Sequence, residues 1–418
     1  MKIAIIGSGV AGLGAAYLLQ RQHQVTLFEA NDYPGGHVNT ITIPEGDQTR
    51  PVDTGFIVYN EATYPHLIRL FAELNVPTQP SNMTFSFSHR DHDFEYGNNG
   101  LGGFFARRRN LFSPTFWRMF LDYRQLNNHG RQVMDAPAYA DYTLGQFLDE
   151  KQYSPAFVNY FLLPMASAIW SAPQAAIRNF PLQYLLHFYH NHGVLINPHP
   201  VQWRTVTGGS HIYVQKLLAA TNLQLHLNTP IKQVTRGADN VTLTLPDDTT
   251  QTFDKLVIAT HSDQALNLLA DPSPAETNIL GQIPYEPNTA VLHTDIRFMP
   301  RRRAAWAAWN YTMVNGQRPE DPATLTYWMN SLQNLDTPTP YLVTINPQQP
   351  VQPDKIIQTI PYAHPAYSLA SLTARQQLSQ LNGQRHTYYC GAYFGYGFHE
   401  DGLKSGVDVA AQLGVTWT

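Results

Sequence analysis

The sequence predicts an α/β fold in which a Rossmann-like unit is joined to a second, discontinuous α+β lobe, and three observations support this class. Residues 2–6 are an apolar run typical of a buried strand, a glycine turn follows, and apolar residues then recur at helical spacing. A chain of 418 residues is too long for one compact core and should divide into two lobes. Buried-strand patterns return near residues 255–260 and 387–390, so we expect the chain to re-enter the first lobe after leaving it.

The first glycine turn has the spacing of a dinucleotide-binding loop. Gly7 can adopt the tight turn, Gly9 lets the backbone approach a pyrophosphate, and Gly12 allows the helix to pack closely on the strand. A second strand at residues 25–28 then presents Glu29, whose carboxylate can accept hydrogen bonds from the ribose hydroxyls of adenosine. An ordinary glycine turn is the alternative, but it does not account for strand, helix and acidic residue in this order.

A second glycine pair, Gly35–Gly36, follows the ribose-binding strand directly, and a plain NAD-binding unit has no need of it. The pair resembles the second pyrophosphate contact of FAD enzymes in the flavin amine oxidase and phytoene desaturase superfamily, where a basic residue often follows. Here that residue is His37, which is only partly protonated near neutral pH, so its charge toward a phosphate stays open. A flexible loop is the alternative. The expected cofactor is FAD.

Composition limits the classes of binding partner and the cellular compartment that we expect. The net charge of −4 and the pI of about 6.5 disfavour a nucleic-acid partner, which would favour a basic surface. The single cysteine, Cys390, excludes an internal disulfide and is typical of a reducing cytoplasm. Because Met1 leads straight into the first strand, we expect no secretory signal and a cytoplasmic protein. The most apolar stretch, residues 157–170, is interrupted by Asn159 and Pro164 and is too short to span a bilayer.

The substrate lobe is expected to come from two insertions. Residues 83–96 alternate as a hairpin with a polar tip, and the following residues, to about Asn197, are helical and rich in aromatics. Strand-like runs with proline-rich connections then predict the sheet of the same lobe. The predicted FAD-binding domain comprises residues 1–75, 198–288 and 377–418, and the predicted substrate domain comprises residues 76–197 and 289–376.

Several segments together resemble a bacterial branch of that superfamily whose members are described as predicted NAD/FAD-binding proteins, and the similarity runs nearly end to end. These segments are QWRTVTGGSHIYVQKL, DKLVIATHSDQAL, MPRRRAAWAAWNY, LTYWMNSLQ and YYCGAYFGYGFHEDGLKSG. The resemblance implies an amine oxidase-like fold. It also implies a lipid-related substrate, because members of the branch are associated with enzymes that modify membrane fatty acids.

By position, the resemblance implies further contacts with FAD. Thr54, Gly55 and Phe56 match a segment that passes beside the isoalloxazine ring. The remaining matches are a backbone clasp of the adenine at Val234, a strand end beneath the cofactor at Thr260, and an approach to the pyrophosphate and ribityl chain at Gly391.

The C-terminal glycine-rich turn is where the chemistry is expected. If a helix begins near Gly402, its amides point at the pyrimidine edge of the flavin and stabilise the negative charge of the reduced ring. Glu400 and Asp401 at this helix end are interpreted as caps. Tyr396 resembles one wall of an aromatic cage, or is a packing residue. His399 is the candidate for proton transfer, because it alone in the turn titrates near neutral pH; a structural histidine bonded to backbone is the alternative.

No metal site is predicted, because no carboxylate or cysteine completes a ligand set with the three histidines at positions 187, 190 and 192. His89 and His92, with two neighbouring aspartates, are expected to be solvated at the hairpin tip. Two further clusters interleave arginines with large apolar residues, one at residues 104–126 and one at residues 299–311. Both suit a surface resting on anionic lipid headgroups or a portal for a fatty acyl carboxylate, with core helices as the alternative.

The reaction class follows from the absence of a second glycine motif for a nicotinamide, since electrons must then come from the substrate. We expect hydride removal from a C–H bond of a fatty-acyl or lipid-like substrate, by a dehydrogenase, a desaturase or a double-bond isomerase. A flavin amine oxidase that releases hydrogen peroxide and a non-catalytic lipid-binding relative are the alternatives, and the intact glycines argue against the latter. Peripheral contact with a membrane surface is compatible with the first hypothesis, and the oligomeric state stays open.

Overall fold

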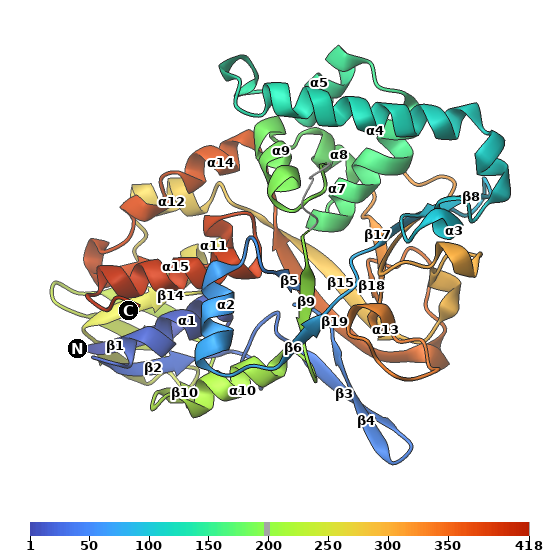
Figure 1. The fold of residues 1–418 in the computed structure, drawn as a ribbon. Coiled ribbons are helices and arrows are strands. Elements are labelled where there is room, and N and C mark those ends of the chain that lie inside the picture. Colours follow the sequence, from blue (N-terminus) through green and yellow to red (C-terminus); the bar gives the residue numbers. More distant parts are fainter. Residues whose placement is uncertain (196–200, 418) are drawn as a thin grey trace.

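A five-stranded parallel sheet forms the centre of the first lobe in the computed structural model, which describes residues 1–195 and 201–417 (Figure 1). Its strands, in spatial order, are β10 (Gln224–His226), β2 (Gln24–Phe28), β1 (Lys2–Ile6), β14 (Lys255–Ile258) and β20 (Thr387–Tyr389). Because these strands come from three separate stretches of the chain, the predicted return to this lobe is confirmed, and so is the α/β class.

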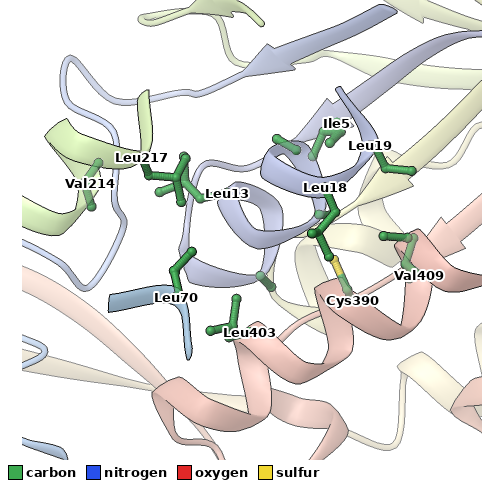
Figure 2. Packing of buried hydrophobic residues seen from close by; sticks show 14 of the residues in the cluster. Ile5, Leu13, Leu18, Leu19, Leu70, Val214, Leu217, Cys390, Leu403 and Val409 are labelled. Carbon is green, nitrogen blue, oxygen red and sulfur yellow. The ribbon is translucent and has the colours of Figure 1, made fainter. Parts of the chain in front are cut away.

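Alternate residues of this sheet face two different cores, as the period of a strand requires. Ile3 and Ile5 pack on one side, against α1 (Val10–Leu19), α15 (His399–Gln412), α2 (Pro65–Glu73) and α10 (His211–Ala219). In Figure 2, side chains of α1 and α15 meet here around Cys390, which is fully buried. Helices α1 and α15 approach very closely, since a Cβ added at Gly406 would lie 2.3 Å from the carbonyl oxygen of Ala11.

The other side of the sheet is covered by a small antiparallel sheet and three helices. The small sheet is formed by β11 (Gln233–Arg236), β12 (Val241–Thr244) and β13 (Thr250–Phe253). The helices are α11 (Ser262–Leu268), α12 (Pro274–Leu280) and α14 (Leu369–Arg375). Arg236 and Glu276 form a buried ion pair within this layer. The hydroxyl of Tyr389, on β20 of the central sheet, also donates to Glu276 at 2.6 Å and so connects the layer to the sheet.

A seven-stranded mixed sheet forms the floor of the second lobe. In spatial order its strands are β19 (Ile356–Pro365), β15 (Tyr285–His293), β18 (Leu342–Ile345), β17 (Thr324–Trp328), β16 (Trp309–Met313), β7 (Phe85–His89) and β8 (Phe94–Gly97). The antiparallel pairing of β7 with β8 confirms the predicted hairpin. The predicted domain boundary at residue 288 lies inside β15, and the one at residue 198 lies outside the described residues.

Asp91 and His92 at the hairpin tip are exposed, as expected, but the polar residues of β7, including His89, do not face solvent, which corrects that part of the expectation. All five residues of the strand are buried, and Ser86 donates to the side-chain carbonyl of Asn310 on β16 at 2.7 Å. His89 is also buried, with its ring centre 4.1 Å from that of His92. The alternation predicted the hairpin but not the burial of its polar face, because that burial depends on segments distant in sequence.

Helices cover one face of the seven-stranded sheet (Figure 1). They are α3 (Leu101–Phe104), α4 (Pro114–Val133), α5 (Leu144–Lys151), α6 (Pro155–Phe157), α7 (Leu163–Trp170), α8 (Gln174–Arg178) and α9 (Leu182–Asn191), with α13 (Met329–Leu332) elsewhere on the sheet. Short strands complete the fold: β3 (Thr40–Glu45) with β4 (Gln48–Asp53), and β5 (Tyr59–Asn60) with β9 (Trp203–Val206) and β6 (Thr78–Pro80). Among the described residues no helix has the length and apolar character needed to cross a bilayer.

Candidate functional site

A cavity of about 1120 Å³ extends from the glycine loop after β1 to the helices of the second lobe. Part of its lining comes from the first lobe, including Gly9 and Glu29, and another part comes from α3, α4 and α7, including Phe104 and Met165. Small-molecule sites usually occupy about 300–1,000 Å³. This cavity can therefore hold a ligand of dinucleotide size together with a second molecule.

The glycine loop offers bare backbone to the cavity. Gly7 has a φ of +100°, and a Cβ added there would lie 3.0 Å from the carbonyl oxygen of Ala259. A Cβ added at Gly9 would have no neighbour within 4 Å, because this position faces open space at the start of α1. Gly12 instead packs against β1, since its Cβ would lie 2.0 Å from the carbonyl oxygen of Gly7. Together these residues form a concave surface at a helix N-terminus, the geometry that binds phosphate.

Glu29 is buried at the end of β2 and is held in place by two neighbours. One carboxylate oxygen accepts from the amide and the hydroxyl of Ser8, at 2.9 and 2.6 Å. The other accepts from the amide and the side-chain nitrogen of Asn31, both at 2.9 Å. Ser8 and Asn31 were not among the predicted site residues, although both are adjacent in sequence to the predicted motif.

The second glycine pair lies directly on the first loop. Gly35 and Gly36 have φ values of +124° and +59°, and a Cβ added at Gly36 would lie 3.3 Å from the Cα of Gly9. His37 stacks on Tyr362 with ring centres 4.6 Å apart. Burial, with a smaller contribution from His364, lowers the pKa of His37 well below its usual value, so the ring is neutral at pH 7. Its Nε2 atom is buried without a hydrogen-bond partner.

The Thr54–Gly55–Phe56 segment lies against this pair and against the C-terminal turn. The amide of Phe56 donates to the carbonyl of His37 at 2.7 Å, and a Cβ added at Gly55 would lie 2.3 Å from that same oxygen. The ring of Phe56 stacks on His399 with centres 3.8 Å apart. The structure therefore brings the predicted isoalloxazine segment and the predicted proton-transfer residue together at one cavity wall.

His399 does not titrate near neutral pH, which corrects the reason for choosing it. The ring is enclosed by Phe56 and Tyr213, and burial lowers its pKa to about 3. Its Nε2 atom shares a 2.6 Å hydrogen bond with the hydroxyl of Tyr213. The sequence places His399 beside a helix start but does not reveal the two aromatic rings that pack against it.

The C-terminal helix begins at His399 and not near Gly402. Gly402 lies outside the cavity lining and packs on α1, where an added Cβ would be 2.7 Å from Cγ1 of Val10, so the cavity does not support its predicted cofactor contact. Asp401 accepts from the amide of Phe398 at 2.9 Å, which confirms it as a cap. Glu400 instead accepts from the amides of His66 and Leu67, both at 3.0 Å, at the start of α2.

Aromatic rings of the C-terminal turn enter the cavity. Tyr396 packs on Tyr184 of α9, with ring centres 4.3 Å apart, and Phe398 stacks on Phe188 of the same helix at 4.9 Å. Both Tyr396 and Phe398 line the cavity. Phe398 was not predicted, although it stands in the same glycine-rich turn and could have been found by that signal.

Of three further predicted cofactor contacts, two lie in the cavity lining and one does not. Thr260 and Gly391 line the cavity, and the amide of Gly391 donates to the hydroxyl of Ser405 at 2.9 Å. Val234 lies outside the lining and its carbonyl accepts from the amide of Ala270 at 2.9 Å, so the cavity does not support its predicted contact with adenine. Ile231, three residues earlier, lines the cavity instead. Both residues have a branched apolar side chain, so the sequence pattern alone cannot tell which of them faces the cavity.

No group of three or more histidine, cysteine or carboxylate side chains that could hold a metal occurs within residues 1–195 and 201–417. His187 contacts Asp135 at 3.1 Å, and His192 stacks on Phe188. Cys390 is buried, and burial raises the pKa of its thiol, consistent with the inert core thiol expected from its position.

Comparison with known proteins identifies the family. The sequence profile described as "Flavin containing amine oxidoreductase" matches residues 10–414, nearly the whole chain. The chain belongs to this family. As a flavin-containing amine oxidoreductase it is an FAD-dependent oxidoreductase, and FAD is its cofactor, as predicted.

Solved structures show the same fold. This flavin-containing amine oxidoreductase resembles a putative protoporphyrinogen oxidase from Exiguobacterium sp. 255-15, with a TM-score of 0.69 and 16% identity over 99% of this chain and 98% of the other. It also resembles a fatty acid isomerase from P. acnes that produces CLA, with a TM-score of 0.69, 18% identity and the same coverage. At these identities the likeness establishes the fold alone.

Curated relatives are matched over part of their length. An L-amino-acid oxidase of Siganus canaliculatus is 24% identical over 70% of this chain and 56% of its own length. A 4,4'-diapophytoene desaturase of Staphylococcus aureus is 52% identical over 42 residues, which are 10% of this chain and 8% of the relative. The matched regions therefore span less than two thirds of these relatives.

The residues of the cavity fit FAD. Gly9 leaves open space where a diphosphate would lie, and an added side chain would occupy that space. The Nε2 atom of His37, which is buried without a hydrogen-bond partner, supplies a polar atom beside the Gly35–Gly36 pair. A carboxylate at the end of β2 and bare amides at the start of α1 are the groups that an adenosine diphosphate requires.

Proposed function

We propose that this flavin-containing amine oxidoreductase removes a hydride from a C–H bond of an apolar, fatty-acyl or other lipid-like substrate. In a dehydrogenase or desaturase, a proton would also leave the neighbouring carbon, to a cavity histidine or to solvent, and a double bond would form. In an isomerase, the hydride would return to a different carbon and the double bond would be shifted. The charge of the cavity is the observation on which the proposal rests. Across the described residues of its lining, Glu29 is the only Asp, Glu, Lys or Arg.

Glu29 belongs to the nucleotide end of the cavity in this proposal. We assign the diphosphate to the backbone at Gly7, Gly9 and Gly36, and the adenosine ribose to Glu29, because these groups face one region of the lining. FAD, when bound, supplies an acceptor for the hydride that leaves the substrate. The flavin ring would lie against the cavity wall that the Thr54–Gly55–Phe56 segment and the C-terminal turn form together.

The remaining chamber suits an acyl chain. Phe104, Met119, Phe120, Phe161 and Met165 line it and present apolar atoms. Burying an acyl chain gains about 0.8 kcal/mol for each methylene removed from water. An ammonium group in the same chamber would lose its hydration and would find no carboxylate there to pair with. Burying such an unpaired charge is costly.

The histidines of the cavity restrict its proton chemistry. Burial lowers the pKa of His364 and of His192 to about 4, and that of His399 to about 3, so all three rings are neutral at pH 7. Neutral rings can orient a substrate through hydrogen bonds without adding charge to the chamber. Tyr396 and Phe398 would form an apolar wall that holds the reacting carbon and excludes water.

The names of similar proteins support the lipid assignment in part. One structural neighbour is named a fatty acid isomerase, and several sequence relatives are named carotenoid desaturases. Other neighbours and relatives are named amine or L-amino-acid oxidases, including a cyclohexylamine oxidase from Brevibacterium oxydans IH-35A. The aromatic pair Tyr396 and Phe398 favours this second candidate, an amine oxidase that releases hydrogen peroxide, because aromatic faces attract amine cations.

Anaerobic flavin reduction distinguishes the two candidates. The FAD-loaded protein is mixed without oxygen with extracted membrane lipids, free unsaturated fatty acids or a panel of amines, and the visible flavin absorbance is recorded. Bleaching by acyl lipids with no response to amines is expected for a dehydrogenase or desaturase. For an isomerase, the expected result is an isomer with a shifted double bond and no lasting bleaching. Bleaching by amines alone, with hydrogen peroxide formed in air, would overturn the proposal.

A further inference from the structure

The helical part of the second lobe carries an exposed apolar surface that, apart from Phe120, lies outside the chamber of the proposed reaction. Large hydrophobic side chains are exposed at ten positions among the described residues, and six of these positions fall within residues 101–121. They are Leu101, Leu111, Phe112, Trp117, Phe120 and Leu121. Phe112 is 83% exposed and Leu101 is 79% exposed. Single exposed apolar residues are normal, but a cluster marks a site of interaction. We call residues 101–124 the α3–α4 patch.

Local hydrogen bonds build the patch. A short 3₁₀ helix, Arg108–Phe112, links α3 to α4, and the side chain of Ser113 caps α4 by accepting from the amide of Phe116 at 3.3 Å. Phe116 turns inward, whereas Trp117 and Leu121 lie one helical turn apart on the outer face. The indole nitrogen of Trp117 donates to the carbonyl of Leu111 at 2.9 Å, which fixes the ring over the 3₁₀ helix.

The exposed charges of the patch have one sign. Between residues 101 and 124 the exposed charged side chains are all arginines, at positions 108, 109, 118 and 124. The single carboxylate of the stretch, Asp122, is buried, pairs with Arg118 and accepts from the amide of Ser154 at 3.0 Å. The patch is therefore cationic on a chain whose net charge is −4.

The second arginine cluster, at residues 301–303, differs because the protein itself engages two of its three arginines, and Arg301 alone is left exposed with no side-chain ion pair or ring contact among the described residues. Arg302 pairs with Asp93 and Glu95, both at 2.8 Å. The guanidinium of Arg303 lies over the ring of Trp306, 3.7 Å from its centre. Of the two clusters that the sequence singles out, only the α3–α4 patch combines exposed apolar side chains with outward-facing arginines.

We propose that the α3–α4 patch docks on an anionic lipid bilayer. Apolar side chains such as Phe112 and Leu121 would enter the boundary between headgroups and acyl chains, while the arginines would meet lipid phosphates. A second copy of this chain is a poorer occupant, because a two-fold interface would bring the arginines of both patches together. The charge of the patch thus selects an anionic surface.

The patch also borders the cavity. Phe104 of α3 and Met119, Phe120 and Tyr123 of α4 line the cavity, so the same two helices separate it from the docking surface. Phe120 belongs to both, since it lines the cavity and is 38% exposed. An acyl substrate would pass from the bilayer into the cavity beside Phe120 without crossing bulk water. This route rests on the proposed function, whereas the docking does not.

Vesicle flotation tests the docking with the FAD-loaded full chain. Vesicles of phosphatidylcholine mixed with phosphatidylglycerol should carry the protein, vesicles of phosphatidylcholine alone should carry far less, and high salt should release it. The double variant Phe112→Ser, Leu121→Ser should lower the partition coefficient at least about tenfold. The matched control Ile296→Ser, Ile356→Ser, at exposed positions outside the patch, should leave it unchanged.

A second variant keeps the test independent of apolar substitutions. Replacing Arg108 and Arg109 by glutamine should weaken binding about fivefold for each charge removed. Equal binding of all variants, or no binding to either vesicle, would overturn the docking. So would a dimer in lipid-free sedimentation that the Phe112→Ser, Leu121→Ser variant alone disrupts, because the patch would then be a contact between copies of the chain.

The substrate route has its own readout. The Phe112→Ser, Leu121→Ser variant should slow flavin reduction by acyl lipids embedded in vesicles but not by a short-chain substrate dispersed in water. An equal effect on both substrates would overturn the route. If neither substrate reduces the flavin while vesicle binding persists, the proposed function fails and the docking stands.

Discussion

Two glycines of the same loop should respond to alanine in opposite ways. At Gly9 an added Cβ would meet no protein atom within 4 Å, and the backbone φ of −64° suits alanine. At Gly12 the Cβ would lie 2.0 Å from the carbonyl oxygen of Gly7, so helix and strand must move apart. Gly9→Ala should therefore cost the apoprotein less than about 1 kcal/mol, as for a changed helix N-cap. Gly12→Ala should cost about 1–3 kcal/mol, as for an overpacked core.

FAD affinity should suffer most at Gly9, the position where alanine costs less stability. A methyl group at Gly9 would occupy the space assigned to the diphosphate, so Gly9→Ala should weaken FAD binding at least about tenfold, or about 1.4 kcal/mol. Urea unfolding of both apoproteins and fluorescence titration with FAD measure the two effects. The reasoning fails if Gly9→Ala binds FAD as tightly as the wild type, or if its apoprotein is as unstable as that of Gly12→Ala.

Other predictions concern the nucleotide end, the cavity wall and the helix cap. Glu29→Gln should weaken FAD binding about tenfold in the same titration, because the amide nitrogen would face the donors of Ser8 or Asn31; unchanged affinity would exclude the ribose contact. Tyr396→Ala should slow anaerobic flavin reduction at least about tenfold while FAD is retained, and equal rates would make it a packing residue. Burial raises the pKa of Asp401 to about 6, so the folded state holds this proton more tightly than the unfolded state. The Asp401 carboxyl should therefore contribute up to about 3 kcal/mol of stability at pH 4 that is lost as the pH rises to about 6, while the buried histidines, whose pKa values are lowered, contribute in the opposite sense. Asp401→Asn should make the unfolding free energy rise more steeply with pH over this range than in the wild type, and an equal slope would contradict the assignment.

Local sequence patterns predicted the fold class because each helix and strand is signalled by the residues within it and directly beside it. The buried strands at residues 2–6 and 255–258 and the glycine loop between strand and helix are readable from apolar runs and glycine spacing. The hairpin at residues 83–97 was readable from alternation. The burial of Ser86 was not, because the cover that removes it from solvent comes from segments hundreds of residues away.

The candidate site was predictable where backbone geometry demands a residue type. Gly7, Gly9 and Gly36 are in this class, because a side chain at any of them would meet either backbone or the cavity. Electrostatics was not predictable in the same way, since the neutral state of His399 depends on Phe56, more than 300 positions earlier in the chain. Position alone also assigned the adenine contact to Val234, which packs inside a sheet and lies outside the cavity lining.

A crystal structure of the FAD-loaded protein would test the central claim most directly. We expect electron density for the diphosphate over Gly9 and for the flavin ring against the wall to which Phe56 and Phe398 belong, with an apolar chamber left beyond it. Protein that purifies without flavin and gains none on reconstitution, or density that places the diphosphate away from Gly9, would contradict it.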